Sequence, residues 1–141
     1  MGSLDDLKIL DFSTLLPGPY ATLMLADMGA EVLKISSASR PDIVLDYPPF
    51  IGDTGVSASQ AWLGRNKKTM FLNLKTGEGK AVVKELVKEY DIVLEQFRPG
   101  VMEKLGLGYE DLKAVNPKLI YCSLTGYGQT GPLRDAAGHD I

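Results

Sequence analysis

The feature that most constrains the fold is a repeated alternation of short apolar runs with longer helical patterns. Apolar runs typical of buried strands cover residues 7–13, 31–36, 67–75, 91–97 and 118–128. Helical patterns separate them at residues 20–30, 76–90, 98–108 and 108–117. Strand, helix and strand in this order predict parallel strands joined by right-handed crossovers. The sequence therefore predicts an α/β fold: a Rossmann-like, open, mostly parallel sheet with helices on both faces.

Two segments fall outside the alternation. Residues 36–60 show no clear period and contain many turn-forming residues, which predicts a long surface loop. Residues 128–141 are polar, glycine-rich and irregular. Neither segment resembles an interdomain linker, and 141 residues suit one domain. We therefore expect residues 1–141 to form a single domain.

Composition excludes several classes of protein. A net charge of −3 argues against a general nucleic-acid binder. No apolar run approaches the length of a membrane span, and the first residues lack a secretion signal pattern. The single cysteine, Cys122, rules out an internal disulfide and suits a reducing compartment. We expect a cytoplasmic protein that contacts neither membrane nor nucleic acid, and without a Cys/His cluster we expect no metal site.

The predicted fold locates a ligand site without identifying the ligand. Open parallel sheets bind ligands outside the carboxyl ends of their strands, where the strand order reverses. The loops expected at those ends are residues 13–19, 36–40, 95–100 and 124–131. None of them contains the complete G-x-G-x-x-G pattern that indicates a dinucleotide site.

Basic residues recur near the expected strand ends and turns. They are Lys34, Arg40, Arg65, Lys67, Lys68, Lys75, Arg98 and Lys104. In an acidic protein, cations gathered at one sheet edge would suit a phosphorylated ligand. The alternative is ordinary solvated surface, which is the commoner role of charged residues. The residues taken alone favour this alternative.

The only histidine, His139, stands between Gly138 and Asp140 near the end of the chain. An imidazole titrates near neutral pH and therefore suits general acid–base catalysis. A lone histidine near a chain end is more often an exposed residue without a catalytic role, and composition and spacing favour that interpretation.

Four longer stretches together resemble one enzyme family. They cover residues 8–35, 64–87, 91–132 and 137–141, in the order that the family has them. The chain resembles the family III CoA-transferases, the CaiB/BaiF group that also contains α-methylacyl-CoA racemases. The final "AGHDI" is similar to the racemase branch in particular.

The resemblance implies an N-terminal domain that binds coenzyme A as part of an acyl-CoA thioester substrate, with no prosthetic group. The residues that match the coenzyme A contacts of the family are Leu72, Asn73, Leu74, Lys75, Phe97, Arg98 and Lys104. Relatives commonly place an arginine just after the second strand, where this chain has Ser36 and Ser37. Arg40 is the candidate substitute for that arginine.

The resemblance also implies a reaction. The racemase interpretation places His139 as one of two acid–base groups that remove and return the α-proton of a 2-methylacyl-CoA, through an enolate. Gly138 matches the stretch that positions the thioester, and Asp140 matches a supporting carboxylate. Transfer of coenzyme A between two carboxylic acids, through an aspartyl intermediate, is the alternative reaction. A third possibility is a coenzyme A-binding or inert module without turnover.

The family pattern continues beyond the last residue of this chain. The aspartate that acts opposite the histidine, the second domain and the segment that returns to the first domain all match later positions. From the resemblance we expect the 141-residue chain to be inactive by itself. We also expect the parent enzyme to form a homodimer, which is interlocked in full-length relatives.

Overall fold

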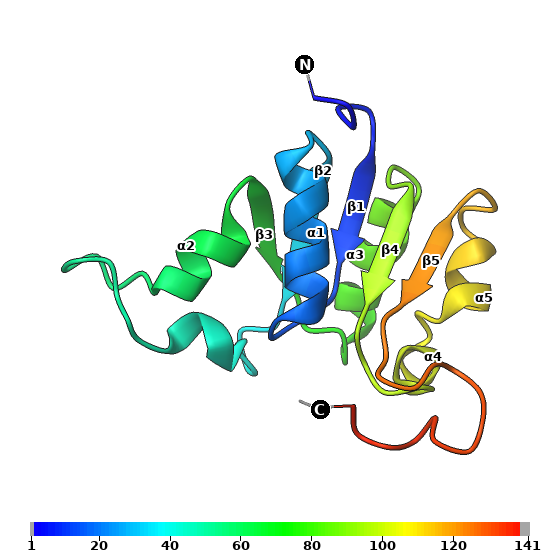
Figure 1. The fold of residues 1–141 in the computed structure, drawn as a ribbon. Coiled ribbons are helices and arrows are strands. Elements are labelled where there is room, and N and C mark those ends of the chain that lie inside the picture. The colour runs from blue at the N-terminus through cyan, green and yellow to red at the C-terminus, as the bar shows by residue number, and fades with distance from the viewer. Residues whose placement is uncertain (1, 139–141) are drawn as a thin grey trace.

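The computed structural model describes residues 2–138 of the chain. Its strands form one sheet in the order β3-β2-β1-β4-β5. Their bounds are β1 Lys8–Asp11, β2 Glu31–Ser36, β3 Lys67–Phe71, β4 Ile92–Glu95 and β5 Ile120–Ser123. Every neighbouring pair is parallel, so all five carboxyl ends lie along the same edge, at the bottom of Figure 1. The predicted parallel sheet is confirmed.

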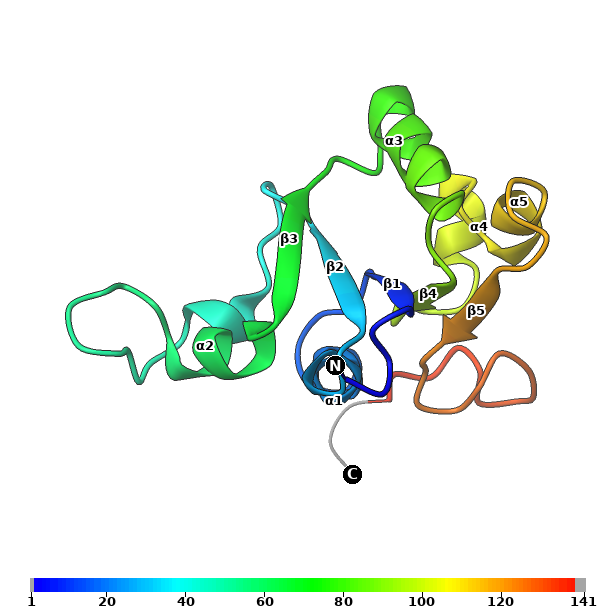
Figure 2. The ribbon, with the colours of Figure 1, turned by 90° about the horizontal axis from the view of Figure 1, so that it is seen from above.

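Helices cover both faces of this sheet, as predicted. They are α1 Pro17–Asp27, η1 Ile43–Asp46, α2 Ala58–Gly64, α3 Gly77–Val87, α4 Val101–Leu105 and α5 Tyr109–Lys113. Figure 2 shows α1 on one face and α3, α4 and α5 on the other. No helix within residues 2–138 is long and apolar enough to cross a membrane.

The period-two alternation of strand side chains divides the core between the two faces. On β1, the fully buried Leu10 belongs to the larger cluster, which includes Val83 of α3 and Met102 of α4. Its neighbour Ile9 faces the opposite way and packs with Ala26 of α1 in a smaller cluster. Both faces of β1 are therefore buried, which explains why its sequence is almost continuously apolar.

Helix α1 begins three residues earlier than the predicted 20–30 range. Pro17 is its first residue and Pro19 lies in the same first turn. Proline is tolerated there because its missing N–H would have no partner within the helix, and its fixed φ already suits a helix. Gly29, which the sequence places at the end of the helix, has a positive φ of 109°.

The prediction of a structureless loop over residues 36–60 is wrong in part, because two short helices begin there. The side chain of Asp42 accepts a hydrogen bond from the backbone N–H of Val44 and starts η1. The hydroxyl of Ser57 accepts one from the N–H of Gln60, at 3.0 Å, and starts α2. Both are N-cap residues, whose oxygens satisfy amides that lack a partner within the helix.

The predicted strand over residues 67–75 is too long, because β3 ends at Phe71. After Leu72, the side chain of Asn73 accepts a hydrogen bond from the N–H of Lys75 at 3.1 Å and turns the chain out of the sheet. Thr76 then caps α3 through the N–H of Gly79. Residues 72–75 are therefore a loop at the carboxyl edge of the sheet.

A buried polar cluster attaches the first turn of α1 to the sheet. Asp11, at the end of β1, is fully buried and accepts hydrogen bonds from the backbone N–H of Ser13 and the hydroxyl of Thr22. The ammonium of Lys67 on β3 lies 3.7 Å from the Asp11 carboxylate. It also donates to the Thr22 hydroxyl at 2.8 Å and to the Pro19 carbonyl at 2.6 Å. One helix turn and two strands thus depend on the same few atoms.

Burial in this cluster changes the titration of Lys67. It lowers the pKa of the ammonium from 10.5 to about 8, although the nearby charge of Asp11 acts in the opposite direction. Between these two pH values, the unfolded chain binds more protons than the folded chain. The free energy of unfolding therefore rises with pH in that window. The cost of burying the charged ammonium is fully present below about pH 8 and is relieved as the pH approaches 10.5.

We predict that Lys67→Met removes this pH dependence. The difference in the free energy of unfolding, wild type minus variant, should rise by up to about 3 kcal/mol between pH 7.5 and pH 10.5. Urea unfolding at several pH values measures it, and taking the difference cancels the titration of other groups. A difference that stays constant over this range, or falls, would contradict the prediction.

Candidate functional site

The strand order reverses between β1 and β4. The chain moves outward from β1 through β2 to β3, then returns to the other side of β1 for β4 and β5. Parallel sheets of this kind form a ligand crevice at the carboxyl ends of the two strands on either side of the reversal. The loops that follow β1 and β4 therefore border the expected crevice.

A specific contact joins these two loops. The side-chain oxygen of Gln96, just after β4, accepts a hydrogen bond from the backbone N–H of Gly18 at 2.9 Å. A Cβ atom at position 18 would lie 2.7 Å from that oxygen and would collide with the side chain of Ser13. Only glycine fits this close approach, so the loops lie against one another at the reversal point.

The predicted ligand residues after β3 differ in their exposure. Leu72 and Leu74 are partly buried and pack against the larger core cluster. Asn73 and Lys75 are exposed. Asn73 holds the turn through its side-chain oxygen, and the ammonium of Lys75 is the charged group that this loop exposes.

The predicted residues after β4 follow the same pattern. Phe97 is partly buried against the same core cluster as Leu72 and Leu74. Its backbone N–H donates to the buried carboxylate of Glu95 at 2.8 Å, and burial raises the pKa of that carboxyl. Arg98 and Lys104 are exposed, and a turn at Gly100 with φ of 85° leads from one to the other. Apolar and cationic groups thus alternate along this loop as they do after β3.

The structure separates the eight basic residues into three groups. Lys34 and Lys67 are buried and paired with Asp42 and Asp11. Arg65 and Lys68 pair with Asp27 and Glu31 at the surface. Within residues 2–138, the remaining four are exposed and form no ion pair: Arg40, Lys75, Arg98 and Lys104. Of the eight, these four are the cations that could bind a phosphorylated ligand without breaking an existing ion pair.

The four cations share one edge of the sheet but come from separate elements. Arg40 lies on the loop after β2, Lys75 after β3 and Arg98 after β4, while Lys104 lies on α4. Strands β2 and β1 lie between β3 and β4, so they separate the loop after β3 from the loop after β4. The structure therefore distributes these cations along the edge, and an extended ligand would suit them better than a compact one.

Gly138 lies close to the end of β5. An added Cβ on Gly126, just past that strand, would lie only 2.6 Å from the Cα of Gly138. The backbone of residues 126–138 therefore leaves the sheet edge and returns to it, as in the compact loops that often have functional roles. His139 and Asp140 lie outside the described residues, so their predicted catalytic roles remain predictions.

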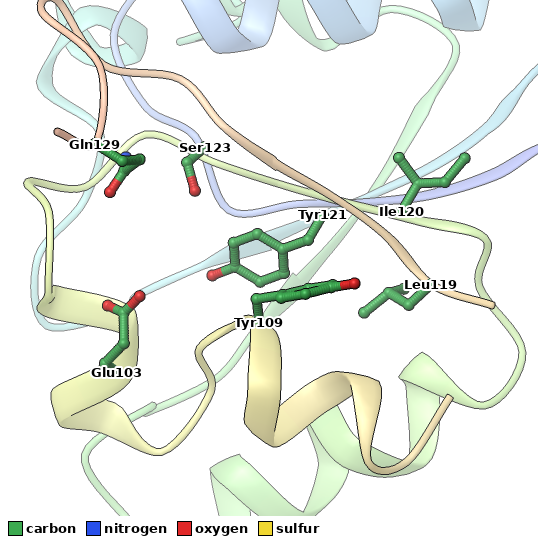
Figure 3. A pocket seen from close by; sticks show the side chains of 7 residues that line it. All are labelled: Glu103, Tyr109, Leu119, Ile120, Tyr121, Ser123 and Gln129. Atoms are coloured by element: carbon green, nitrogen blue, oxygen red, sulfur yellow. The ribbon is translucent and has the colours of Figure 1, made fainter. Parts of the chain in front are cut away.

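A separate hollow of about 450 Å³ lies beside β5. Figure 3 shows its lining: Glu103, Tyr109, Leu119, Ile120, Tyr121, Ser123 and Gln129. The rings of Tyr109 and Tyr121 meet edge to face, 6.0 Å apart. Burial, with nearby carboxylates, raises the pKa of the Tyr121 hydroxyl. The lining contains a carboxylate and no cation, so this hollow is a poor phosphate site, and it contains none of the predicted site residues.

Sequence reasoning missed the buried polar residues that shape the edge. Asp11 and Glu95 are each the final residue of a buried strand, and both are almost fully buried. The sequence signal that could have identified them is an acidic residue at the end of an otherwise apolar run. A buried charge requires partners, so such a residue predicts a buried polar cluster. The cationic partner of Asp11 could not be read from the sequence, because Lys67 comes from a different strand. Within the described residues, no three potential metal ligands cluster together.

Known proteins share this sequence and this fold. The sequence pattern of CoA-transferase family III matches residues 4–141. The human succinyl-CoA:glutarate CoA-transferase is 43% identical over 138 residues, which cover 97% of this chain and 31% of that protein. The succinyl-CoA–D-citramalate CoA-transferase of Chloroflexus aurantiacus is 44% identical, over 96% of this chain and 33% of its own length. These relatives are named for CoA transfer and not for racemisation.

A solved structure has the same fold as this chain. The crystal structure of a CaiB/BaiF family protein from Brucella suis superposes with a TM-score of 0.91 at 41% identity, over 99% of this chain and 37% of that one. The chain thus spans about a third of the length of the relatives that it matches. Sequence and fold together show that the chain belongs to CoA-transferase family III.

Proposed function

We propose that this chain binds the coenzyme A part of an acyl-CoA thioester, for an enzyme that transfers coenzyme A between carboxylic acids. The observation that most supports the proposal is the set of exposed, unpaired cations within the described residues, at the sheet edge where this fold binds ligands. Family membership supplies the chemistry. The names of the relatives favour transfer over the racemase that the sequence analysis places first.

Coenzyme A matches the edge in length and in chemistry. It carries a diphosphate and a further phosphate on its ribose, and a long uncharged pantetheine arm extends from them. Lys75, Arg98 and Lys104 would pair with the phosphates, with Arg40 as a fourth cation. The partly buried Leu72, Leu74 and Phe97 would supply apolar contacts for the adenine or the arm. No prosthetic group enters this scheme, since coenzyme A arrives with the substrate.

The substrates that we propose follow the relatives. Their names combine succinyl-CoA with a dicarboxylic acid, glutarate or D-citramalate. We therefore infer a CoA ester as donor and a dicarboxylate as acceptor. The thioester bond of the donor breaks and an equivalent one forms on the acceptor, so no oxidant or added energy source is needed.

Removal of the cations should weaken binding of coenzyme A to the purified chain. We predict that Lys75→Ala, Arg98→Ala and Lys104→Ala each reduce the affinity by about tenfold, because each removes a charge-assisted contact. Isothermal titration calorimetry with coenzyme A measures this. Lys118→Ala is the matched control, since Lys118 is also exposed but lies before β5, at the opposite edge of the sheet. Absence of binding by the wild type, or an equal loss in the control, would contradict the assignment.

The reaction can be separated from racemisation by its products. We predict that the complete enzyme containing this chain moves coenzyme A from succinyl-CoA to a dicarboxylate, and that the 141-residue chain alone shows no turnover. Chromatography of the CoA esters in deuterated water tests both statements. Deuterium at the α-carbon of a 2-methylacyl-CoA without any acceptor acid would identify a racemase instead. Rapid transfer by the isolated chain would refute its proposed inactivity.

We further propose that the enzyme is a homodimer in which the outer side of α1 is covered. Leu16, Tyr20, Met24 and Met28 recur every four residues and are each between 45% and 52% exposed. This spacing aligns them along one side of the helix. Trp62 of α2 adds its ring, 5.7 Å from that of Tyr20. A continuous apolar stripe of this kind is typical of a surface that another protein surface covers.

The stripe should make the purified chain self-associate. We predict that the wild type elutes above the monomer mass in size-exclusion chromatography with light scattering, and that Met24→Glu shifts it to the monomer. Val82→Glu is the control, because Val82 is 39% exposed but lies on α3, across the sheet. A wild type that elutes as a clean monomer would count against the proposal.

A further inference from the structure

The loop after β1 has an unusual backbone that is held from a distance. Leu15 has a φ of 61°, in the left-handed region that leucine rarely adopts. Its backbone N–H donates to both carboxylate oxygens of Asp42, at 3.1 and 3.0 Å. Such a conformation costs free energy and persists only where surrounding contacts enforce it. The Asp42 carboxylate, 27 residues later in the chain, supplies that contact.

Lys34 supports the same carboxylate from within the sheet. Its ammonium lies 3.3 Å from Asp42 and donates to the carbonyl of Ser13 at 3.1 Å. The side chains of Lys34 and Asp42 are only 7% and 3% exposed. Lys34 thus neutralises the buried charge and also fixes the beginning of the loop that Asp42 holds at Leu15. The loop is thus attached at Ser13 by Lys34 and at Leu15 by Asp42, and these two side chains form an ion pair with one another.

Among the hydrogen bonds of the described residues, those of Asp42 are the direct link between the start of η1 and this loop. Helix η1, which Asp42 starts, contains no buried residue. A hollow of about 510 Å³ lies beside Lys34 and Asp42, between η1, α2 and the ends of β2 and β3. Helix η1 is also held to α2, because the Ser57 hydroxyl donates to the Leu45 carbonyl at 2.6 Å. Within the described residues, however, the charged hydrogen bonds of Asp42 are its direct connection to the loop after β1.

The position of this loop suggests which part of a ligand it would meet. It follows β1, between the loop after β3 that contains Lys75 and the loop after β4 that contains Arg98. Its outer residue Thr14 is exposed and uncharged. Phosphates would favour the cations on either side, whereas an uncharged arm would suit this stretch.

We propose that Asp42, supported by Lys34, is a positioning residue that fixes the loop at residues 13–16 for the pantetheine and thioester end of a CoA ester. The inference rests on the proposed function. It assigns the two ends of the ligand to different parts of the edge. The nucleotide end depends on the exposed cations, and the thioester end depends on a buried ion pair that never touches the ligand.

The test compares coenzyme A with adenosine 3′,5′-bisphosphate, which is its nucleotide end without the arm. Asp42→Asn keeps the shape of the side chain but removes its charge, so the ion pair with Lys34 is lost and one oxygen instead of two is left to accept from the Leu15 N–H. We expect Asp42→Asn to weaken coenzyme A binding by about tenfold, while the affinity for the bisphosphate changes by less than about twofold. Lys34→Met should show the same selectivity. Asp53→Asn is the matched control, because Asp53 is exposed in the same loop.

Hydrogen exchange of the Leu15 amide supplies a readout that needs no ligand. Asp42→Asn should accelerate this exchange and Asp53→Asn should leave it unchanged. An unaffected Leu15 amide, or an equal loss of affinity for both ligands, would overturn the positioning role while leaving the proposed function intact. Failure of the wild type to bind either ligand would overturn the proposed function, and the positioning role with it.

Discussion

Two buried lysines, Lys34 and Lys67, organise the carboxyl edge of the sheet through their acidic partners. Lys34 and Lys67 project from neighbouring strands into a region where each must find an anion, because an unpaired buried charge costs several kcal/mol. Asp11, at the end of β1, forms an ion pair with Lys67, and Asp42, on the long loop after β2, forms one with Lys34. These two ion pairs hold α1, the loop after β1 and the long loop after β2 together at the edge of the sheet where the strand order reverses.

The same requirement explains how the surface cations remain available. The buried pairs and the surface pairs of Arg65 and Lys68 account for four basic residues, and each has a nearby acid. The loops that contain Lys75 and Arg98 are held by backbone groups and by neighbouring side chains such as Asn73, Glu95 and Gln96. Within the described residues, the charged groups of Lys75 and Arg98 take no part in these contacts. A chain with net negative charge can thus present an edge suited to phosphates.

Local pattern was enough to predict the sheet, since strands buried on both faces and one strongly amphipathic helix leave clear periodicities. It failed where single side chains decide the structure. Asn73 ended β3 early, and Ser57 started a helix inside the predicted loop. The family resemblance selected the four exposed cations as candidates. The residue pattern alone could not separate them from Lys34 and Lys67, whose acidic partners come from other elements. Asp42 could not have been predicted, because its bond to Leu15 depends on tertiary structure.

We propose that coenzyme A binds along the carboxyl edge of the sheet, with its phosphates at the loops after β3 and β4. The most direct test is a titration of the isotopically labelled chain with coenzyme A, followed through the chemical shifts of its backbone amides. We predict that the largest chemical-shift changes fall at residues 72–75 and 97–104, with smaller ones at residues 13–18 and none around Lys118. Changes centred instead on Tyr109 and Tyr121, in the hollow beside β5, would contradict it.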